Sequence, residues 1–421
     1  MNVIIHPKKL SGDVLIPPSK SLSHRAIIAA CLAEGESVIS NISFSKDINA
    51  TIDAMISLGA KVVKDGNTLY ITGSKIKRVG KLIDANESGS TIRFMIPIAL
   101  VNSEPITFTG QNHLVKRPLD SYYEIFDRLC ISYSHPADAY LPLDVNGGLK
   151  AGVYEMRGDI SSQFITGLLY ALPLLDGDSK IVITTNLESI GYIDLTLDVL
   201  KDFGIKVINN DYKEFIIEGN QKYKPNNYTV EGDYSQTAFY LVGGALGNDI
   251  NLLGMKEHSL QGDKKIIDDI KSMNGDVSFV DGVLKCSPSN TVGATIDFSQ
   301  SPDLGPALSV LASLSDGTSN FINASRLRIK ECDRITCMLE ELNKMGANIT
   351  ETYDTMTIHG VSELHGCVVD SHNDHRVAMA LAMAATRCSE DVKILNAQCV
   401  SKSYPHFWED YIKLGGSVDF E

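Results

Sequence analysis

The sequence predicts an α/β protein made of two globular halves, each with three copies of one structural unit. Three observations predict this fold class. A short pattern recurs at nearly even spacing, an amphipathic stretch precedes each copy, and an alternating stretch follows it. At 421 residues the chain is too long for one small core and fits two or three domains.

The recurring pattern begins with an apolar residue. The second residue is usually glycine, and a short spacer and a β-branched residue follow. The clear copies are LGAKV, FGIKV, MGANI and LGGSV, and the weaker copies are LCISY and MNGDV. Their second positions lie 69 to 74 residues apart, at 59, 130, 204, 274, 346 and 415. A unit of about 70 residues is too long for common solenoid repeats, so we expect two globular groups of three.

Each copy fits a helix that ends and turns into a strand. The preceding stretches have helical periodicity and cover residues 47–57, 119–128, 192–202, 263–272, 333–344 and 405–413. Glycine at the second position permits the left-handed backbone that ends many helices. The runs that follow, such as residues 206–219, alternate like strands.

Composition narrows the function. The formal net charge of -14 disfavours non-specific binding to nucleic acid or to anionic membranes. Residues 1–10 lack the apolar core of a signal peptide, and no window has the roughly 18 apolar residues of a membrane span. The eight cysteines form no CxxC pair. We therefore expect a cytoplasmic protein with reduced thiols and no cysteine metal site.

The first cationic motif is SKSLSHR, residues 19–25, which precedes an apolar helix. Ser19 or Ser21 would cap this helix, and Ser21 and Arg25 would share one face. Free N–H groups at a helix start, together with Lys20 and Arg25, would form a site for an anion. The alternative is a capped helix with solvated charges.

NESGSTIRF, residues 86–94, repeats this design. Gly89 would let the backbone approach a ligand, Ser90 and Thr91 would cap the helix or donate hydrogen bonds, and Arg93 follows one turn later. RGDISSQFITGLL, residues 157–169, places neutral donors before another apolar helix. Both motifs are also compatible with ordinary capped helices.

Two further motifs combine charges with helix starts. In RLRIKECDR, residues 326–334, we expect the strand RLRIK to run into a helix, with Lys330 and Arg334 one turn apart; solvated ion pairs are the alternative. In HNDHR, residues 372–376, Asp374 fits an N-cap and Arg376 an anion clamp. Metal ligation there is disfavoured, because Arg376 would repel a cation.

Several common motifs are absent from the sequence. It has no GxxxxGK[ST] loop, no GxGxxG before a helix, no GxSxG elbow and no HExxH. Kinase-like, dinucleotide-dependent and common hydrolase functions therefore lose support. Several helix starts with cations and hydroxyls favour a ligand with several negative charges.

Nine motifs, in order, resemble those of the 5-enolpyruvylshikimate-3-phosphate synthase family: SKSLSHR, ESGSTIRF, KRPLD, SSQF, ESIGYID, SPDLGPAL, RLRIKECDR, NDHR and SKSYP. The resemblance covers about residue 7 to residue 414. It implies a two-domain enolpyruvyl transferase fold of six βαβαββ units, which form two inverse αβ-barrel-like globes. One domain would be residues 19–229, and the other would be residues 1–18 and 230–421.

The resemblance implies transfer of the enolpyruvyl group of phosphoenolpyruvate to the 5-hydroxyl of shikimate 3-phosphate, in the shikimate pathway, with no metal or organic cofactor. The N-terminal domain would mainly bind shikimate 3-phosphate, and the C-terminal domain would carry the catalytic carboxylates and much of the phosphoenolpyruvate site. Residues implied for shikimate 3-phosphate are Ser21, Arg25, Ser161, Ser162, Gln163, Ser189, Tyr192, Arg326 and Lys330. Those implied for phosphoenolpyruvate are Lys20, Gly89, Arg117, Arg334, Arg376 and Lys402.

The resemblance also implies catalytic roles. Asp303 resembles the base near the 5-hydroxyl, and Glu331 resembles the carboxyl group near the methylene carbon of phosphoenolpyruvate. Lys20 and Lys402 would protonate the leaving or bridging oxygen and stabilise the tetrahedral intermediate. Which group moves which proton stays open.

Two positions depart from the commonest family pattern. Glu87 and Arg326 stand where many members have asparagine. Arg326 would add a positive charge that binds the phosphate of shikimate 3-phosphate. Glu87 would repel the carboxylate of phosphoenolpyruvate, so we do not expect it to bind a substrate. Glycine at position 89 implies sensitivity to glyphosate, which we therefore expect to inhibit.

Two alternatives were weighed. A UDP-N-acetylglucosamine enolpyruvyl transferase would have a Lys-Asn pair in its N-terminal motif and a reactive cysteine in a loop. Here Ser21 follows Lys20, and no cysteine lies in a glycine-rich loop. A non-catalytic anion-binding protein of the same fold would lose the acid and base groups, yet Asp303 and Glu331 are present. We expect a monomer with two small-molecule substrates.

Overall fold

The computed structural model describes residues 1–421 and confirms the mixed α/β class. The chain divides into two compact units. Unit 1 comprises Met1–Ser19 and Glu231–Glu421, and unit 2 comprises Lys20–Val230. No helix is both long enough and apolar enough to cross a membrane. Which substrate each of the two domains binds stays a prediction.

Unit 2 contains three four-stranded sheets, with the strand orders β14-β3-β5-β4, β6-β7-β9-β8 and β10-β11-β13-β12. In each sheet the first pair is parallel and the other pairs are antiparallel. The strands are β3 (Gly35–Ser40), β4 (Lys61–Asp65), β5 (Thr68–Gly73), β6 (Leu82–Asp84), β7 (Ile106–Thr109), β8 (Ser132–Ser134), β9 (Leu143–Asn146), β10 (Val153–Met156), β11 (Ser179–Ile183), β12 (Ile208–Asn210), β13 (Glu214–Ile217) and β14 (Asn227–Thr229). The helices are α1 (Lys20–Leu32), α2 (Lys46–Ser57), α3 (Gly89–Ala99), α4 (Asp120–Leu129), α5 (Ser162–Ala171) and α6 (Ile190–Asp202).

Unit 1 repeats this plan with the orders β16-β17-β15-β2, β18-β19-β21-β20 and β22-β23-β1-β24. Its strands are β1 (Val3–His6), β2 (Ser11–Leu15), β15 (Asp249–Leu253), β16 (Asp276–Val280), β17 (Val283–Ser287), β18 (Thr295–Asp297), β19 (Thr318–Ile322), β20 (Asn348–Glu351), β21 (Met356–His359), β22 (Val368–Asp370), β23 (Val392–Leu395) and β24 (Ser417–Phe420). Its helices are α7 (Tyr234–Ala245), α8 (Ile266–Ser272), α9 (Gly305–Ser313), α10 (Arg334–Lys344), α11 (His375–Ala385) and α12 (Phe407–Lys413). Short 3₁₀ segments connect these elements: η1 (Asn112–Lys116) and η2 (Leu172–Leu174) in unit 2, and η3 (Gly262–Lys265), η4 (Pro302–Leu304), η5 (Ser325–Ile329) and η6 (Ala397–Lys402) in unit 1.

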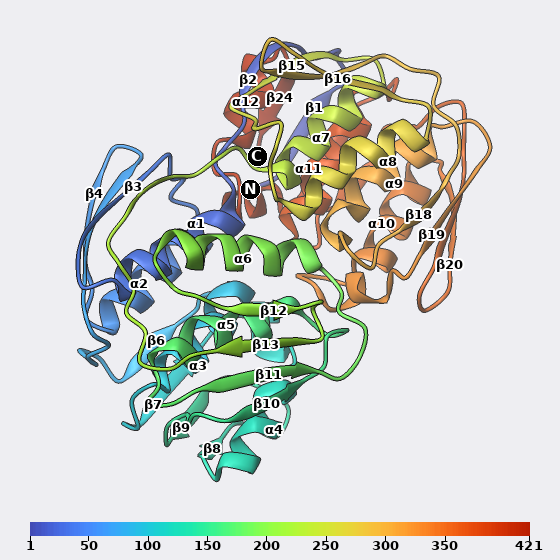
Figure 1. Cartoon of the computed structure of the whole chain (residues 1–421). Coiled ribbons are helices and arrows are strands. Elements are labelled where there is room, and N and C mark those ends of the chain that lie inside the picture. Colours follow the sequence, from blue (N-terminus) through green and yellow to red (C-terminus); the bar gives the residue numbers. More distant parts are fainter. The chain divides into compact units, whose positions relative to one another are not determined.

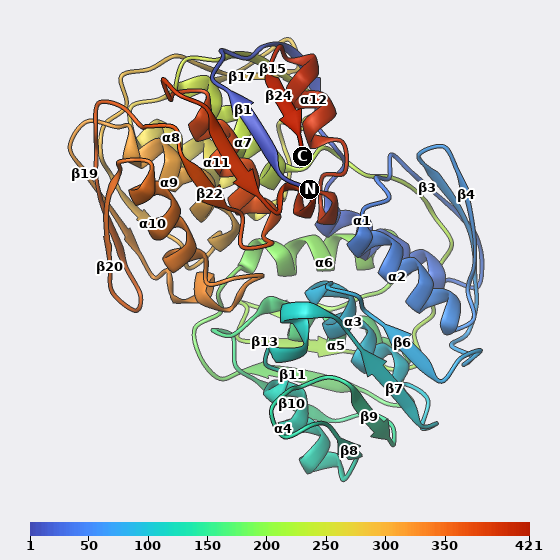
Figure 2. The ribbon, with the colours of Figure 1, turned by 180° about the vertical axis from the view of Figure 1, so that it is seen from behind.

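The N-terminal strands belong to unit 1. Strand β1, blue among the red strands in Figure 2, lies between β23 and β24, where Val3 pairs with Ile394 and Phe420. Strand β2 pairs in parallel with β15. In unit 2 the late strand β14 completes the sheet of β3 in the same way. Segments distant in sequence thus supply the missing strands of their repeats.

Each repeat has one buried helix and one helix on the outer side. Every residue of α7 and α11 is buried, because these helices are apolar on all sides. Helices α2, α4 and α10 instead have one apolar and one polar face, as the sequence pattern predicts. In Figure 1 the sheets of each unit lie around its buried helices. The buried helices matter for function, because most predicted anion motifs are at their N-terminal ends.

All six turns predicted from the recurring pattern have left-handed backbone. The φ angles at positions 59, 130, 204, 274, 346 and 415 are 106°, 54°, 80°, 64°, 96° and 91°. Four of these positions are glycine, but Cys130 and Asn274 are not. Since a side chain crowds left-handed backbone, these two repeats keep the turn despite a poorer residue.

We predict that Cys130→Gly stabilises the protein. Cys130 is exposed and forms the left-handed C-cap of α4, so glycine would lose no core contacts. Relief of roughly 1 to 2 kcal/mol of left-handed strain, less roughly 0.5 to 1 kcal/mol for the greater freedom of the unfolded chain, should leave a net gain of about 0.5 to 1 kcal/mol. Urea unfolding followed by circular dichroism should show a higher midpoint. The matched variant Cys130→Val should lower the midpoint, because β-branched residues tolerate this conformation least. Equal midpoints for both variants would contradict the prediction.

Candidate functional site

The predicted residues of unit 1 gather at the ends of short helical segments. Asp303 lies in η4 just before α9, Arg334 begins α10, and Lys402 ends η6. The predicted cap of α11 is confirmed, because the Asp374 side chain accepts the N–H of Arg376 at 2.8 Å. The ends of these helical segments therefore carry the side chains of one charged cluster.

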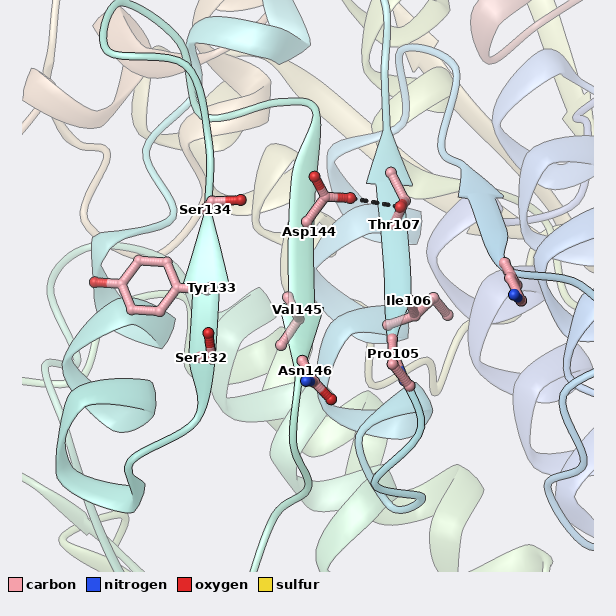
Figure 3. Close-up of a pocket in the computed structure, with 10 residues that line it drawn as sticks. Pro105, Ile106, Thr107, Ser132, Tyr133, Ser134, Asp144, Val145 and Asn146 are labelled. Atoms are coloured by element: carbon pink, nitrogen blue, oxygen red, sulfur yellow. Dashed lines mark hydrogen bonds between the residues drawn. The ribbon is translucent and has the colours of Figure 1, made fainter.

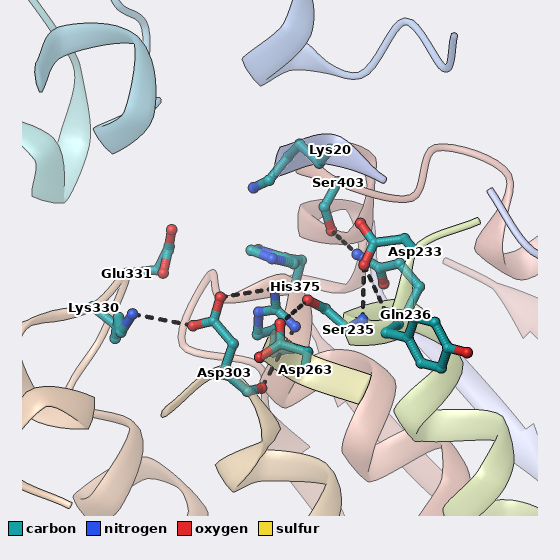
Figure 4. A network of polar contacts seen from close by, with 12 residues as sticks. Lys20, Asp233, Ser235, Gln236, Asp263, Asp303, Lys330, Glu331, His375 and Ser403 are labelled. Atoms are coloured by element: carbon teal, nitrogen blue, oxygen red, sulfur yellow. Dashed lines mark hydrogen bonds and ion pairs between the residues drawn. The ribbon is translucent and has the colours of Figure 1, made fainter. Parts of the chain in front are cut away.

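Asp303 is surrounded by cations from three elements. One carboxylate oxygen lies 3.1 Å from Lys330 Nζ and 2.9 Å from Arg334 Nη1. The other lies 3.0 Å from Arg376 Nη2. Figure 4 shows Lys330 and Asp303 pointing toward one another from neighbouring segments. The topology thus brings together three sequence-predicted cations and one predicted carboxylate.

Arg334 links this carboxylate to two others. Its Nη2 lies 2.8 Å from Glu331 Oε2, and its Nε lies 2.7 Å from Asp374 Oδ2. Glu331 Oε1 in turn lies 3.5 Å from Lys402 Nζ. Arg334 is only 1% exposed, so its charge depends on these partners rather than on water.

The cluster shifts the ionisation of its members. Burial opposes the charge of Asp303, but Arg376, Lys330 and Arg334 together hold its pKa well below the usual range. Burial lowers the pKa of Lys330 to about 8, although Asp303 opposes this shift. Burial likewise opposes the charge of Arg334, but Asp374, Glu331 and Asp303 raise its pKa well above the usual value. Lys330 is thus a cation that can release a proton near neutral pH.

This arrangement has a chemical consequence. Four cations and three carboxylates leave one net positive charge in a largely buried cluster. An anionic ligand would compete with Asp303 and Glu331 for their arginines and lysines. Arginine is suited to this exchange, because its planar fork binds carboxylate or phosphate through two parallel hydrogen bonds.

In unit 2 a second cluster surrounds the start of α3. A Cβ at Gly89 would come within 2.5 Å of Arg117 Nη1, so the absence of a side chain makes room for this guanidinium. Glu87 accepts a hydrogen bond of 2.9 Å from the Asn112 amide. The helix cap is Ser88, which accepts the N–H of Thr91 at 3.1 Å, and not Ser90 or Thr91. Thr91 instead takes the other predicted role and donates its hydroxyl to Ser88 Oγ at 2.7 Å. Because the cap lies one residue before Gly89, Ser90 is in the first turn of α3 and its side chain contacts a neighbouring helix.

That neighbouring helix is α5, whose predicted donors meet α3 directly. Gln163 accepts 2.8 Å from Arg93 Nη1 and donates 2.9 Å to Ser90 Oγ. Ser161 caps α5 by accepting the N–H of Gln163, which fits the alternative of an ordinary capped helix. The motifs at 86–94 and 157–169 therefore form one polar surface.

Helix α1 brings its motif to α2, α5 and α6. Lys20 Nζ lies 2.8 Å from Asp47 Oδ2, a partner that the sequence analysis missed. Arg25 is buried and donates to Ser21 O, Thr196 Oγ1 and Tyr192 O at 2.9 Å each. Ser189 precedes α6 with a left-handed φ of 56°. Arg25 therefore also fixes α1 against α6, which a ligand role alone would not require.

RLRIK is not a strand, contrary to the prediction. It forms the 3₁₀ segment η5, in which Leu327 is buried while Ile329 is 37% exposed. In a strand these two residues would share a face, whereas a period of three turns them to different sides. Arg326 is buried and donates to Ser299 O at 3.3 Å. Arg328 pairs with Asp333 and Glu351, so it fits the alternative of ion pairing.

Two other features, a pocket and a group of acidic residues with a histidine, are weaker candidates for a functional site. A pocket of about 330 Å³ lies over β7, β8 and β9, where Thr107 donates to Asp144 (Figure 3), but it contains no predicted site residue. Glu340, Glu341 and His372 could approach a metal ion. Lys344, however, already lies 2.9 Å from both oxygens of Glu341 and neutralises it.

The fold and these clusters, with carboxylates paired to lysines and arginines, are typical of an enzyme that acts on small anionic molecules. The family model of EPSP synthase (3-phosphoshikimate 1-carboxyvinyltransferase) matches residues 4–411. A 3-phosphoshikimate 1-carboxyvinyltransferase of Clostridium perfringens is 53% identical and is matched over 100% of this chain and 99% of its own length. The corresponding protein of Clostridioides difficile is 52% identical over 99% and 98% of the two chains.

A solved structure agrees with these relatives. EPSP synthase from Acinetobacter baumannii superimposes with a TM-score of 0.82 at 25% identity, with both chains covered completely. The chain therefore belongs to the EPSP synthase family and is a transferase. This family is supported over the nucleotide-sugar transferase that was weighed as an alternative.

Proposed function

We propose that the protein transfers the enolpyruvyl group of phosphoenolpyruvate to the 5-hydroxyl of shikimate 3-phosphate and releases phosphate. Family membership supports the reaction. The observation that carries the residue roles is the ion-pair cluster of Asp303 and Glu331 with Lys330, Arg334 and Lys402. Both substrates carry a carboxylate and a phosphate, so each needs several cations.

Binding groups are proposed for each substrate. For shikimate 3-phosphate they are Ser21, Arg25, Ser161, Ser162, Gln163, Ser189, Tyr192, Arg326 and Lys330. For phosphoenolpyruvate they are Lys20, Gly89, Arg117, Arg334, Arg376 and Lys402. Cytoplasmic location, the monomeric state and the lack of any cofactor stay predictions from the sequence.

The proton transfers follow from the environment of Asp303. Three cations keep this carboxylate ionised and make it a weak base. A bound phosphate or carboxylate that takes up Arg376, Lys330 or Arg334 would raise the pKa of Asp303 and strengthen it as a base. Ligand binding would thus activate the base that removes the proton of the 5-hydroxyl.

The remaining steps are an addition and an elimination, and neither needs an oxidant or a reductant. The 5-oxygen bonds to C2 of phosphoenolpyruvate while Glu331, protonated in the substrate complex, gives its proton to the methylene carbon. The Glu331 carboxylate formed in this step then removes a proton from the new methyl group, and phosphate departs as the double bond is restored. Lys402, 3.5 Å from Glu331, would protonate the departing oxygen and stabilise the tetrahedral intermediate.

The proposal predicts phosphate release only when both substrates are present. Release from phosphoenolpyruvate should occur with shikimate 3-phosphate, but not with UDP-N-acetylglucosamine, and should persist in EDTA. Asp303→Ala and Glu331→Ala should each lower kcat about 10²- to 10⁴-fold, the usual contribution of acid–base groups. The control Asp249→Ala, an exposed carboxylate of β15, should leave kcat unchanged. No release with shikimate 3-phosphate would contradict the proposal.

We further propose that glyphosate inhibits the protein at the start of α3, and this predicts the effect of Gly89→Ala. The added Cβ must displace Arg117, so the inhibition constant for glyphosate and the KM for phosphoenolpyruvate should both rise about tenfold or more. Steady-state kinetics measures both constants. In the control Gly80→Ala the new Cβ would have no neighbour closer than 3.9 Å, and both constants should stay unchanged. Unaltered glyphosate inhibition in Gly89→Ala would count against this site.

A further inference from the structure

His24 has no role in the function described so far, although it lies in the SKSLSHR motif. It is completely buried on α1, one turn after Lys20. Burial lowers the pKa of His24 to about 3, and Lys20 and Arg25 add to this shift while Asp47 opposes it. The imidazole is therefore neutral at the pH of the cytoplasm, and it acts through hydrogen bonds rather than charge.

A continuous chain of short hydrogen bonds starts at this imidazole. His24 Nδ1 lies 2.7 Å from Thr51 Oγ1, and Thr51 Oγ1 lies 2.7 Å from Thr91 Oγ1. Thr91 Oγ1 in turn donates to Ser88 Oγ at 2.7 Å. Each hydroxyl has one proton, so when Thr91 donates to Ser88, Thr51 must donate to Thr91. His24 then completes the chain only as the tautomer protonated on Nδ1.

The chain runs parallel to the ion pair of Lys20. Lys20 and His24 are one turn apart on α1, and their partners Asp47 and Thr51 are one turn apart on α2. Two adjacent contacts thus fix the rotation of α1 against α2. The chain ends at Ser88, the cap of α3, directly before Gly89 and its neighbour Arg117.

We propose that His24 is a positioning residue that, through Thr51 and Thr91, fixes Lys20 and the Ser88–Gly89 turn relative to one another. The inference rests on the proposed function, because it assigns the purpose of the chain to phosphoenolpyruvate binding. Lys20 and Gly89 come from motifs more than 60 residues apart. A buried neutral chain can hold them in place without adding a charge beside the ligand.

The test is a double-mutant cycle in the full-length protein. His24→Leu and Thr51→Val each break the chain, and Thr51→Val does so with nearly unchanged shape. Each should lower kcat/KM for phosphoenolpyruvate on the order of 10- to 100-fold, the scale expected for slight misplacement of a reacting group. The double variant should lose no more than either single variant. His24→Asn, which keeps a donor close to the Nδ1 position, should recover most of the activity.

The outcomes separate positioning from folding and from the function itself. Lower melting temperatures with unchanged kinetic constants, or additive losses in the double variant, would overturn the positioning role. If His24→Leu does not fold, Thr51→Val alone decides, because full activity in that variant would equally overturn it. An unchanged protein without phosphate release would overturn the proposed function, and the proposal that rests on it. An active unchanged protein with unaffected variants would overturn the positioning role alone.

Discussion

The charged cluster of unit 1 depends on one buried guanidinium, that of Arg334. It pairs with Asp374, Glu331 and Asp303, and it is almost fully removed from water. A buried charge without a partner is costly, and removing one member of a buried pair typically costs about 3 to 5 kcal/mol. Arg334 therefore holds both proposed catalytic carboxylates in place, and it is one of the cations that an anionic ligand would bind.

The repeats explain why such clusters arise in both units. Each repeat places a buried helix behind a sheet, and a buried helix must satisfy the N–H groups at its start. Ser88, Ser161 and Asp374 cap three of these helices. The positive dipole ends of these helix starts favour anions, and the lysines and arginines placed beside them add to that attraction. Function thus uses the same positions in different copies of one unit.

The sequence was most informative where geometry is local. Left-handed turns at all six repeat positions follow from a pattern only a few residues long. RLRIK misled because its alternation fits both a strand and a 3₁₀ segment, and only the fold decides which apolar residue is buried. The pairing of Lys20 with Asp47 was missed because the partners are on different helices. Contacts such as Asp303 with Arg376 likewise depend on tertiary packing, which one chain's local pattern does not encode.

An anionic ligand would take over cations that are paired with the protein's own carboxylates in the structure. Lys330, with a pKa lowered to about 8, reports this exchange directly. Below that pH it is charged, and at pH 8 it is about half protonated, so a bound anion that restores its pKa must draw in up to about half a proton. Calorimetry of shikimate 3-phosphate binding at pH 8, in buffers of different ionisation enthalpy, measures this uptake. We predict proton uptake in the unchanged protein and its loss in Lys330→Arg. Binding without proton uptake, or equal uptake in both proteins, would contradict the account.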